Sequence, residues 1–267
     1  MKTLDALFAQ VRAEDRAALI GYLPAGYPTV AESKELLAAM LDGGCDLVEV
    51  GVPYSDPVMD GPTIQAAADT ALRNGFRLRE TFDVVQSVTD HGGHAVVMTY
   101  WNPVHHYGVD AFARDLIAAG GHGLITPDLI PDEAEEWLDV SEKHALDRIF
   151  LVAPSSSEER IARTVKASSG FVYATAVMGV TGARESVGAG AAELVRRTRA
   201  HTELPIGVGL GVRSGEQAAE VASFADAVIV GSAFVTAAKE GAGAVRALAE
   251  ELAGGVRRKS GHATVAP

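Results

Sequence analysis

The sequence DLVEVGVPYSDPVMDGP at positions 46–62 begins as an apolar β-strand and then breaks into a loop rich in proline and glycine. Glu49 interrupts the apolar run, and Asp56 and Asp60 follow in the loop. An unpaired carboxylate is costly to bury unless it stays protonated. Either consequence points to chemistry, so Glu49 is a candidate catalytic residue.

Side chains alternate along a strand, so Leu47, Glu49 and Gly51 share one face and the intervening valines share the other. The valine face is suited to packing under helices. We expect the Glu49 face to open into a separate space, in which Gly51 leaves room beside the carboxylate. An edge strand with Glu49 in water is the alternative, but the apolar character of both faces favours a covered parallel sheet.

Short runs of Val, Ile and Leu alternate with helical patterns along the whole chain. The eight predicted strands are Ala18–Leu23, Asp46–Val52, Ala95–Tyr100, Gly121–Ile125, Arg148–Ala153, Gly170–Ala174, Pro205–Gly209 and Ala227–Gly231. Repeated strand–helix units predict a parallel sheet. Eight of them predict an α/β fold of the (β/α)8 class, a TIM barrel. An open doubly wound sheet is the alternative, but GYLPAG at 21–26 matches its G-x-G-x-x-G turn poorly.

The domain organisation follows from the same pattern. We predict a single barrel domain at residues 1–253 and a flexible tail at residues 254–267. The amphipathic segment Leu4–Val11 is an extra N-terminal helix, expected at the bottom of the barrel. Three helix starts carry capping boxes, Thr29 with Glu32, Ser156 with Glu159 and Ser214 with Gln217. Gly43 is expected to end the second helix in a left-handed conformation.

The composition excludes several classes of protein. Lys and Arg number 23 against 35 Asp and Glu, a formal charge of −12, which argues against nucleic acid or an anionic membrane as a partner. Cys45 is the single cysteine, so neither an internal disulfide nor a CxxC motif exists. The N-terminus does not resemble a signal peptide, and no apolar run is long enough to span a membrane. We therefore expect a cytoplasmic protein.

Several kinds of catalytic site are also disfavoured. The six lysines all lie in helical or terminal segments, whereas a Schiff-base barrel needs a lysine on a strand. The eight histidines do not match the spacing of a zinc site. Neither a nucleophile elbow nor a P-loop is present. Carboxylates, backbone donors and aromatic rings remain as the chemical groups of a site.

Glycine-rich loops follow the last three predicted strands, at Gly179–Gly182, Gly207–Gly211 and Gly231–Ser232. Backbone N–H groups in such loops and at helix N-termini bind anions, and barrels commonly hold phosphate at this rim. Ordinary tight turns are the alternative. Gly179–Gly182 also has the composition of a lid around Thr181, although a static turn fits it equally well.

Three tyrosines, Tyr22, Tyr100 and Tyr173, lie at or near predicted strand ends, which places them near one rim. They could fill the barrel. Because Glu49 opens into the same space, we favour a pocket for a flat apolar ring with polar handles.

Several separated segments of this chain resemble the tryptophan synthase alpha chain family. The resemblance rests on GYLPAGYP at 21–28, EVGVPYSDP at 49–57, DGPTIQ at 60–65, YWNP at 100–103, GVTG at 179–182, GLG at 209–211 and GS at 231–232. It implies a cofactor-independent lyase that cleaves indole-3-glycerol phosphate to indole and glyceraldehyde 3-phosphate by a retro-aldol step.

The resemblance also implies roles for individual residues. Glu49 matches the general acid/base, and Asp60 matches the carboxylate that holds the indole N–H. Positions near the indole ring and in the phosphate cradle are matched by Tyr22, Tyr100, Tyr173, Leu210, Thr181, Gly182, Gly211, Gly231 and Ser232. Two departures stand out: Tyr22 replaces a frequent Phe, and Ala176-Val177-Met178 replaces a run with Ser and Arg before the lid.

A partner is implied in the same way. The family pairs with a beta chain that carries pyridoxal phosphate, as an alpha2-beta2 heterotetramer, and the loop Pro53–Asp60 matches the contact. Asp56 matches a residue that links the two sites. Two alternatives remain open, another phosphosugar lyase or isomerase on a TIM barrel and a non-catalytic regulatory barrel subunit.

Overall fold

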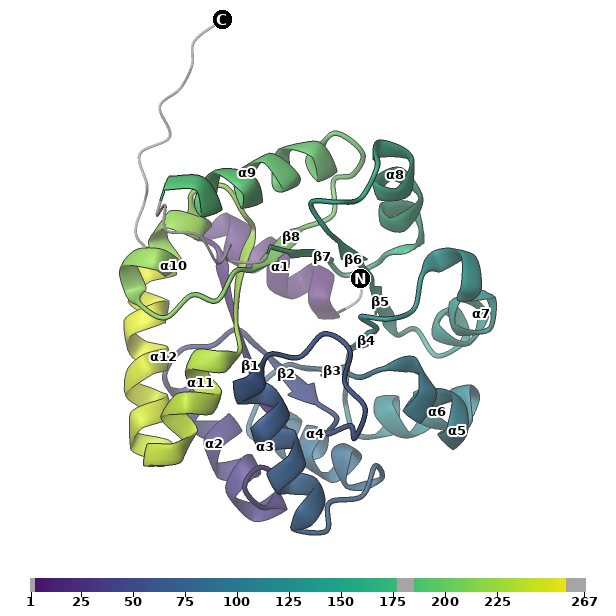
Figure 1. Cartoon of the computed structure of the whole chain (residues 1–267), viewed down its shortest axis with the longest axis vertical. Coiled ribbons are helices and arrows are strands. Elements are labelled where there is room, and N and C mark those ends of the chain that lie inside the picture. Colours follow the sequence, from purple (N-terminus) through teal and green to yellow (C-terminus); the bar gives the residue numbers. More distant parts are fainter. Residues whose placement is uncertain (1–2, 177–184, 258–267) are drawn as a thin grey trace, which may run out of the picture.

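The computed structural model describes residues 3–176 and 185–257, and Figure 1 shows its strands ringed by helices. The strands are β1 (Ala18–Pro24), β2 (Leu47–Gly51), β3 (Ala95–Met98), β4 (Gly123–Ile125), β5 (Asp147–Ile149), β6 (Leu151–Val152), β7 (Val172–Thr175), β8 (Ile206–Gly209) and β9 (Ala227–Val230). The α-helices are α1 (Thr3–Ala13), α2 (Val30–Asp42), α3 (Pro62–Arg73), α4 (Glu80–Asp90), α5 (Trp101–Tyr107), α6 (Val109–Ala118), α7 (Glu135–Lys143), α8 (Glu158–Ala167), α9 (Glu185–Arg199), α10 (Gly215–Ala222), α11 (Ser232–Ala237) and α12 (Ala242–Val256). Two 3-10 helices are η1 (Pro131–Glu133) and η2 (Ala238–Glu240).

The sheet is parallel throughout, in the order β5-β4-β3-β2-β1-β9-β8-β7-β6. Its two end strands, β5 and β6, are halves of one predicted strand, separated only by Phe150. The chain itself therefore closes the ring. The TIM barrel is confirmed, and every predicted strand lies within a residue or two of an observed one.

The N-terminal end of the barrel is closed by α1, which lies across the ring in Figure 1. Its apolar face is buried against the interior of the barrel, and the rings of Phe8 and Phe171 are 5.8 Å apart. That face consists of Leu4, Leu7, Phe8 and Val11. The spacing is helical, so a short amphipathic helix suffices to cover the interior. The predicted extra N-terminal helix is confirmed.

Two details of the helix ends differ from the prediction. Ser157, not Ser156, caps α8 and accepts the Arg160 N–H at 3.3 Å. Gly43 has φ −79°, and the left-handed residue after α2 is Gly44, at φ +104°. The caps at Thr29 and Ser214 form as predicted. Each difference is a shift of one residue, which local sequence does not resolve.

Candidate active site

Glu49 lies in the middle of β2, opposite Tyr22 of β1 and Val96 of β3. Its neighbour Leu47 belongs to the apolar cluster inside the barrel, whereas Val48 and its partners pack under the helices. Alternation along the strand therefore turns Glu49 inward, as predicted. Because α1 covers the other end of the barrel, we expect a ligand to approach from the C-terminal rim.

Glu49 is 1% exposed, and its Oε1 has no hydrogen-bond partner among the residues that the structure describes. Burial raises its pKa to about 8. An acid with this pKa is mostly protonated at neutral pH and can both donate and accept a proton. A buried carboxyl oxygen without a partner is rare in a folded protein, and together with a raised pKa it makes Glu49 a candidate for a functional site.

The space beside Glu49 is not empty. A Cβ added to Gly51 would collide with the Tyr22 ring and hydroxyl, and one added to Gly209 would lie 2.6 Å from the Tyr173 hydroxyl. The expectation that Gly51 leaves open space is therefore wrong, because the two glycines make room for two phenol rings. Burial and the nearby Glu49 raise the pKa of Tyr22 and of Tyr173. Both rings therefore remain neutral donors beside the carboxyl group.

Asp60 lies on the loop between β2 and α3, where Tyr100 anchors it. The Tyr100 hydroxyl accepts the N–H groups of Val58 at 3.2 Å and Met59 at 3.0 Å. Its own proton is then left for the Asp60 carboxylate. Burial raises the pKa of Asp60, and the hydrogen bond from Tyr100 lowers it. Tyr54 adds a ring contact to Tyr100, with centroids 5.3 Å apart.

The predicted anion site lies where β8 and β9 end. Gly211 has a left-handed backbone, at φ +71°. Gly231 precedes α11, and a Cβ added there would lie 3.5 Å from the Tyr22 ring. Ser232 is the first residue of that helix, whose first N–H groups lack intrahelical partners. Gly231 and Ser232 therefore lie near Tyr22 at the end of β9, which pairs with β1 on the side away from β2.

Of the other residues predicted for the site, one lies in the core, one lies at the surface and the rest fall outside the described residues. Leu210 is buried at 6% exposure and belongs to the apolar cluster that includes Tyr22. Asp56 is exposed and accepts the Ser55 hydroxyl at 2.6 Å. Thr181 and Gly182, the segment Gly179–Gly182 and the departure at Val177-Met178 lie outside the described residues.

Sequence reasoning missed a cavity of about 180 Å³ at the same rim. Its lining includes Met59, which precedes Asp60; Thr126, Leu151 and Thr175, at or beside other strands; and Ser156, in the loop after β6. Thr126 is 1% exposed, and its hydroxyl has no partner within the described part of the chain. The sequence could have indicated this cavity through the positions of these residues, because residues that directly follow barrel strands meet at this rim.

Within residues 3–176 and 185–257, no group of three or more His, Cys, Asp or Glu side chains could hold a metal ion. None of the helices in those ranges has the length and apolar character needed to cross a membrane.

Comparison with known proteins gives one consistent result. The family model for the tryptophan synthase alpha chain matches residues 8–260. The tryptophan synthase alpha chain of Nocardia farcinica is 66% identical over 250 residues, covering 94% of each chain. A Mycobacterium tuberculosis tryptophan synthase structure matches with a TM-score of 0.92 at 62% identity, covering 96% of this chain and 99% of that one. The alpha subunit from Legionella pneumophila matches with a TM-score of 0.88 at 30% identity, covering 96% and 98%. The chain belongs to the tryptophan synthase alpha chain family.

Proposed function

We propose that Glu49 is the general acid/base with which this chain cleaves indole-3-glycerol phosphate. As a member of its family, the chain is a lyase of tryptophan biosynthesis that acts on this substrate. The observation that carries the residue assignment is the buried carboxyl group of Glu49, unpaired at Oε1, with its pKa raised to about 8.

In the proposed reaction, Glu49 first donates a proton and then accepts one. The protonated Glu49 gives its proton to the indole ring carbon that carries the glycerol phosphate chain. The resulting carboxylate takes the proton of the adjacent glycerol hydroxyl as the carbon–carbon bond breaks. The bonding electrons return to the ring, which leaves as indole, and the hydroxyl carbon becomes the aldehyde of glyceraldehyde 3-phosphate. Glu49 ends protonated, ready for another turnover.

Asp60 stabilises the intermediate in this proposal. Protonation of the ring places positive charge on the indole nitrogen, and a carboxylate that accepts the N–H offsets that charge. The carboxylate must be ionised for this: burial raises the pKa of Asp60, and the hydrogen bond from Tyr100 opposes that rise. Burial strengthens the interaction because the site is poor in water.

The rest of the site binds the substrate. Tyr22, Tyr100, Tyr173 and Leu210 would contact the indole ring, and the backbone at Gly211, Gly231 and Ser232 would hold the phosphate. Thr181 and Gly182 complete the proposed cradle. An acidic protein needs such backbone donors, because its formal charge of −12 repels an anion at long range.

We also propose the partner implied by the resemblance, a beta chain that carries pyridoxal phosphate, in an alpha2-beta2 heterotetramer. This chain would need no cofactor of its own and would act in the cytoplasm, without nucleic acid or membrane. Support comes from the loop Pro53–Asp60, where the apolar Val58 and Met59 are 76% and 49% exposed beside the exposed Asp56. Exposed apolar side chains rimmed by polar groups are typical of an interface.

The domain boundary stays a prediction. α12 runs to Val256, which is 2% exposed, so the ordered helix continues three residues beyond the predicted end of the barrel at 253. Residues 258–267 of the predicted flexible tail lie outside the described part of the chain.

The experiment mixes the purified chain with indole-3-glycerol phosphate and measures free indole, with and without the beta chain. Glu49→Gln should remove indole release while leaving binding of the phosphate substrate unchanged. The reverse reaction separates this function from another phosphosugar enzyme, because only a lyase of this type joins indole to glyceraldehyde 3-phosphate. Full turnover by Glu49→Gln would contradict the assignment of Glu49.

A further inference from the structure

The loop that joins β6 to α8, residues 153–157, lies at the catalytic rim and is closed by its own hydrogen bonds. The Ala153 N–H donates to the Ser156 hydroxyl at 3.1 Å, and the Ser156 N–H donates to the Ala153 carbonyl at 2.9 Å. The loop directly follows Leu151 and Val152 of β6, and Leu151 is in register with Tyr173 of β7. Its position is therefore tied to a strand that carries a site residue.

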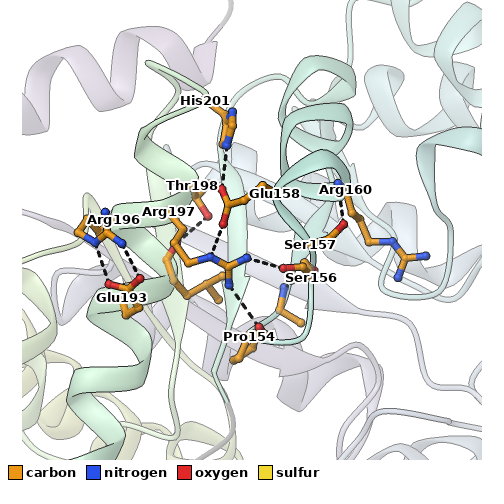
Figure 2. Close-up of polar contacts among 12 residues, drawn as sticks. Pro154, Ser156, Ser157, Glu158, Arg160, Glu193, Arg196, Arg197, Thr198 and His201 are labelled. Carbon is orange, nitrogen blue, oxygen red and sulfur yellow. Dashed lines mark hydrogen bonds and ion pairs between the residues drawn. The ribbon is translucent and has the colours of Figure 1, made fainter.

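One side chain from α9 holds this loop, as Figure 2 shows. The Arg197 guanidinium donates through Nε to Glu158 Oε1 at 2.5 Å, and through Nη2 and Nη1 to the carbonyls of Ser156 at 2.6 Å and Pro154 at 3.3 Å. His201 lies 3.0 Å from the other Glu158 oxygen. The Arg197 side chain is only 21% exposed. A planar fork of five donors can serve a carboxylate and two carbonyls together, which an ammonium group cannot do in one fixed geometry.

The adjacent arginine provides a contrast. Arg196 points to Glu193 of its own helix, with contacts of 2.6 and 2.8 Å, and both side chains are more than half exposed. A surface pair three residues apart on one helix contributes little to stability and positions nothing outside that helix. Arg196 and Arg197 thus carry the same charge on the same helix, but only Arg197 reaches the loop.

The loop forms part of the wall of the 180 Å³ cavity, through Ala153, Ser155 and Ser156. Met59 and Thr175 line the same cavity from other elements. Met59 precedes Asp60, and Thr175 shares its strand face with Tyr173. A displacement of the loop would therefore change the space beside the segments that carry Asp60 and Tyr173.

We propose that Arg197 is a positioning residue for the lyase reaction, holding the loop 153–157 in place so that this wall keeps the rim of the site in its productive geometry. The expected change in kcat/KM rests on the proposed function. The contact between Arg197 and the loop is measured separately, by hydrogen exchange. Small misplacements of groups around a site are enough to slow a reaction that depends on orientation.

The test compares Arg197→Ala, Arg197→Lys and Arg196→Ala with the unaltered chain, in the presence of the beta chain. For Arg197→Ala we expect a loss of kcat/KM for indole-3-glycerol phosphate of about tenfold. Arg196→Ala should match the unaltered chain. Arg197→Lys should restore the melting temperature, because it keeps the pair with Glu158, but not kcat/KM, because it loses the carbonyl contacts.

Amide hydrogen exchange at Ala153 and Ser156 gives a readout that does not need activity. Exchange should be faster in both Arg197 variants and unchanged in Arg196→Ala. If Arg197→Lys restored both kcat/KM and the melting temperature, the proposal would be overturned. The contact between Arg197 and Glu158 would then be a purely structural ion pair. Equal behaviour of Arg197→Ala and Arg196→Ala would overturn it as well. If the unaltered chain released no indole, the proposed function would fail, and the exchange rates would still decide whether Arg197 holds the loop.

Discussion

Carboxylates at the two ends of the barrel differ in whether they have partners. At the closed end, Arg16 pairs with Asp46 through two contacts of 2.7 and 2.8 Å, and Arg199 pairs with Asp226. The Asp46 carboxylate also accepts the Leu19 N–H at 2.9 Å. Further toward the open end, in the middle of β2, Glu49 is more deeply buried than Asp46, yet its Oε1 contacts no donor among the described residues.

This difference teaches which carboxylates hold the fold together and which are available for chemistry. A carboxylate that accepts hydrogen bonds from an arginine and a backbone N–H joins the elements that carry those donors. An unpaired carboxyl group in the interior lowers the stability of the fold, and burial raises its pKa. One strand illustrates both cases, since Asp46 immediately precedes β2 and Glu49 lies within it.

Glu49→Gln should have the largest effect on catalysis. Loss of a general acid/base lowers kcat by about 10³-fold. The fold should not suffer, because an amide avoids the cost of burying a charge. Initial rates of indole release give kcat, and a melting curve checks the fold. Unfolding of the variant at neutral pH would show that Glu49 is structural and would break the contrast between the two ends.

The same variant makes a prediction about pH. Glu49 has a folded pKa of about 8 and an ordinary value of 4.5, so the folded state holds this proton over a range in which the unfolded state has released it. Stability from this group is thus present below pH 4.5 and lost as the pH rises toward 8. The free energy of unfolding of the unaltered chain, relative to Glu49→Gln, should fall across this range. Equal slopes would contradict a raised pKa.

Asp60→Asn should have the next largest effect, a loss of rate on the order of 10²-fold, because it removes the charge that opposes the ring cation. KM should change less than kcat if the charge acts mainly on the intermediate. Steady-state kinetics with indole-3-glycerol phosphate measure both constants. A rise in KM with unchanged kcat would show that Asp60 only binds the substrate.

Arg16→Ala tests the closed end. Removing Arg16 leaves the partly buried Asp46 without its ion-pair partner, and we expect a loss of about 2 kcal/mol in the free energy of unfolding, less than for a fully buried pair. Turnover by the folded fraction should be unchanged. Denaturant unfolding measures the loss, and Arg73→Ala is the control, since Arg73 is 78% exposed in its pair with Asp69. Equal stability of the two variants would remove the distinction between paired and surface charges.

The smallest effect is expected from a histidine pair at the closed end. His94 and His122 lie 3.0 Å apart, ahead of β3 and β4, and burial together with His94 lowers the pKa of His122 to about 4. The unfolded chain therefore binds this proton more readily, so stability is present above pH 6.5 and lost as the pH falls toward 4. His122→Gln should reduce this loss by on the order of 1 kcal/mol, measured by unfolding at pH 7 and pH 5. An unchanged slope would exclude the pair as its source.

The fold was predictable because its signals are local. Apolar runs alternate with capped helical patterns, and Leu4–Val11 carries its own helical period. The inward facing of Glu49 followed from the alternation of five strand residues. The break at Phe150 and the shift of the cap to Ser157 are local irregularities that such patterns do not resolve.

The surroundings of Glu49 were less predictable, since they depend on residues brought together by the closed sheet. The Tyr22 ring occupies the space above Gly51 because β1 and β2 pair in one particular register. The contacts of Tyr100 with the Asp60 loop, and of Arg197 with the loop after β6, join segments about 40 residues apart. A pattern along the chain predicts that such segments share a rim, but not which atoms meet.

The protonation of the Glu49 carboxyl group can be followed directly by its titration. The side-chain carboxyl carbon of Glu49, assigned by comparison with Glu49→Gln in ¹³C NMR spectra, should titrate with a pKa of about 8. That result would establish a buried acid available at neutral pH. A midpoint near the ordinary value of 4.5 would contradict it and show that Glu49 is ionised in the folded chain.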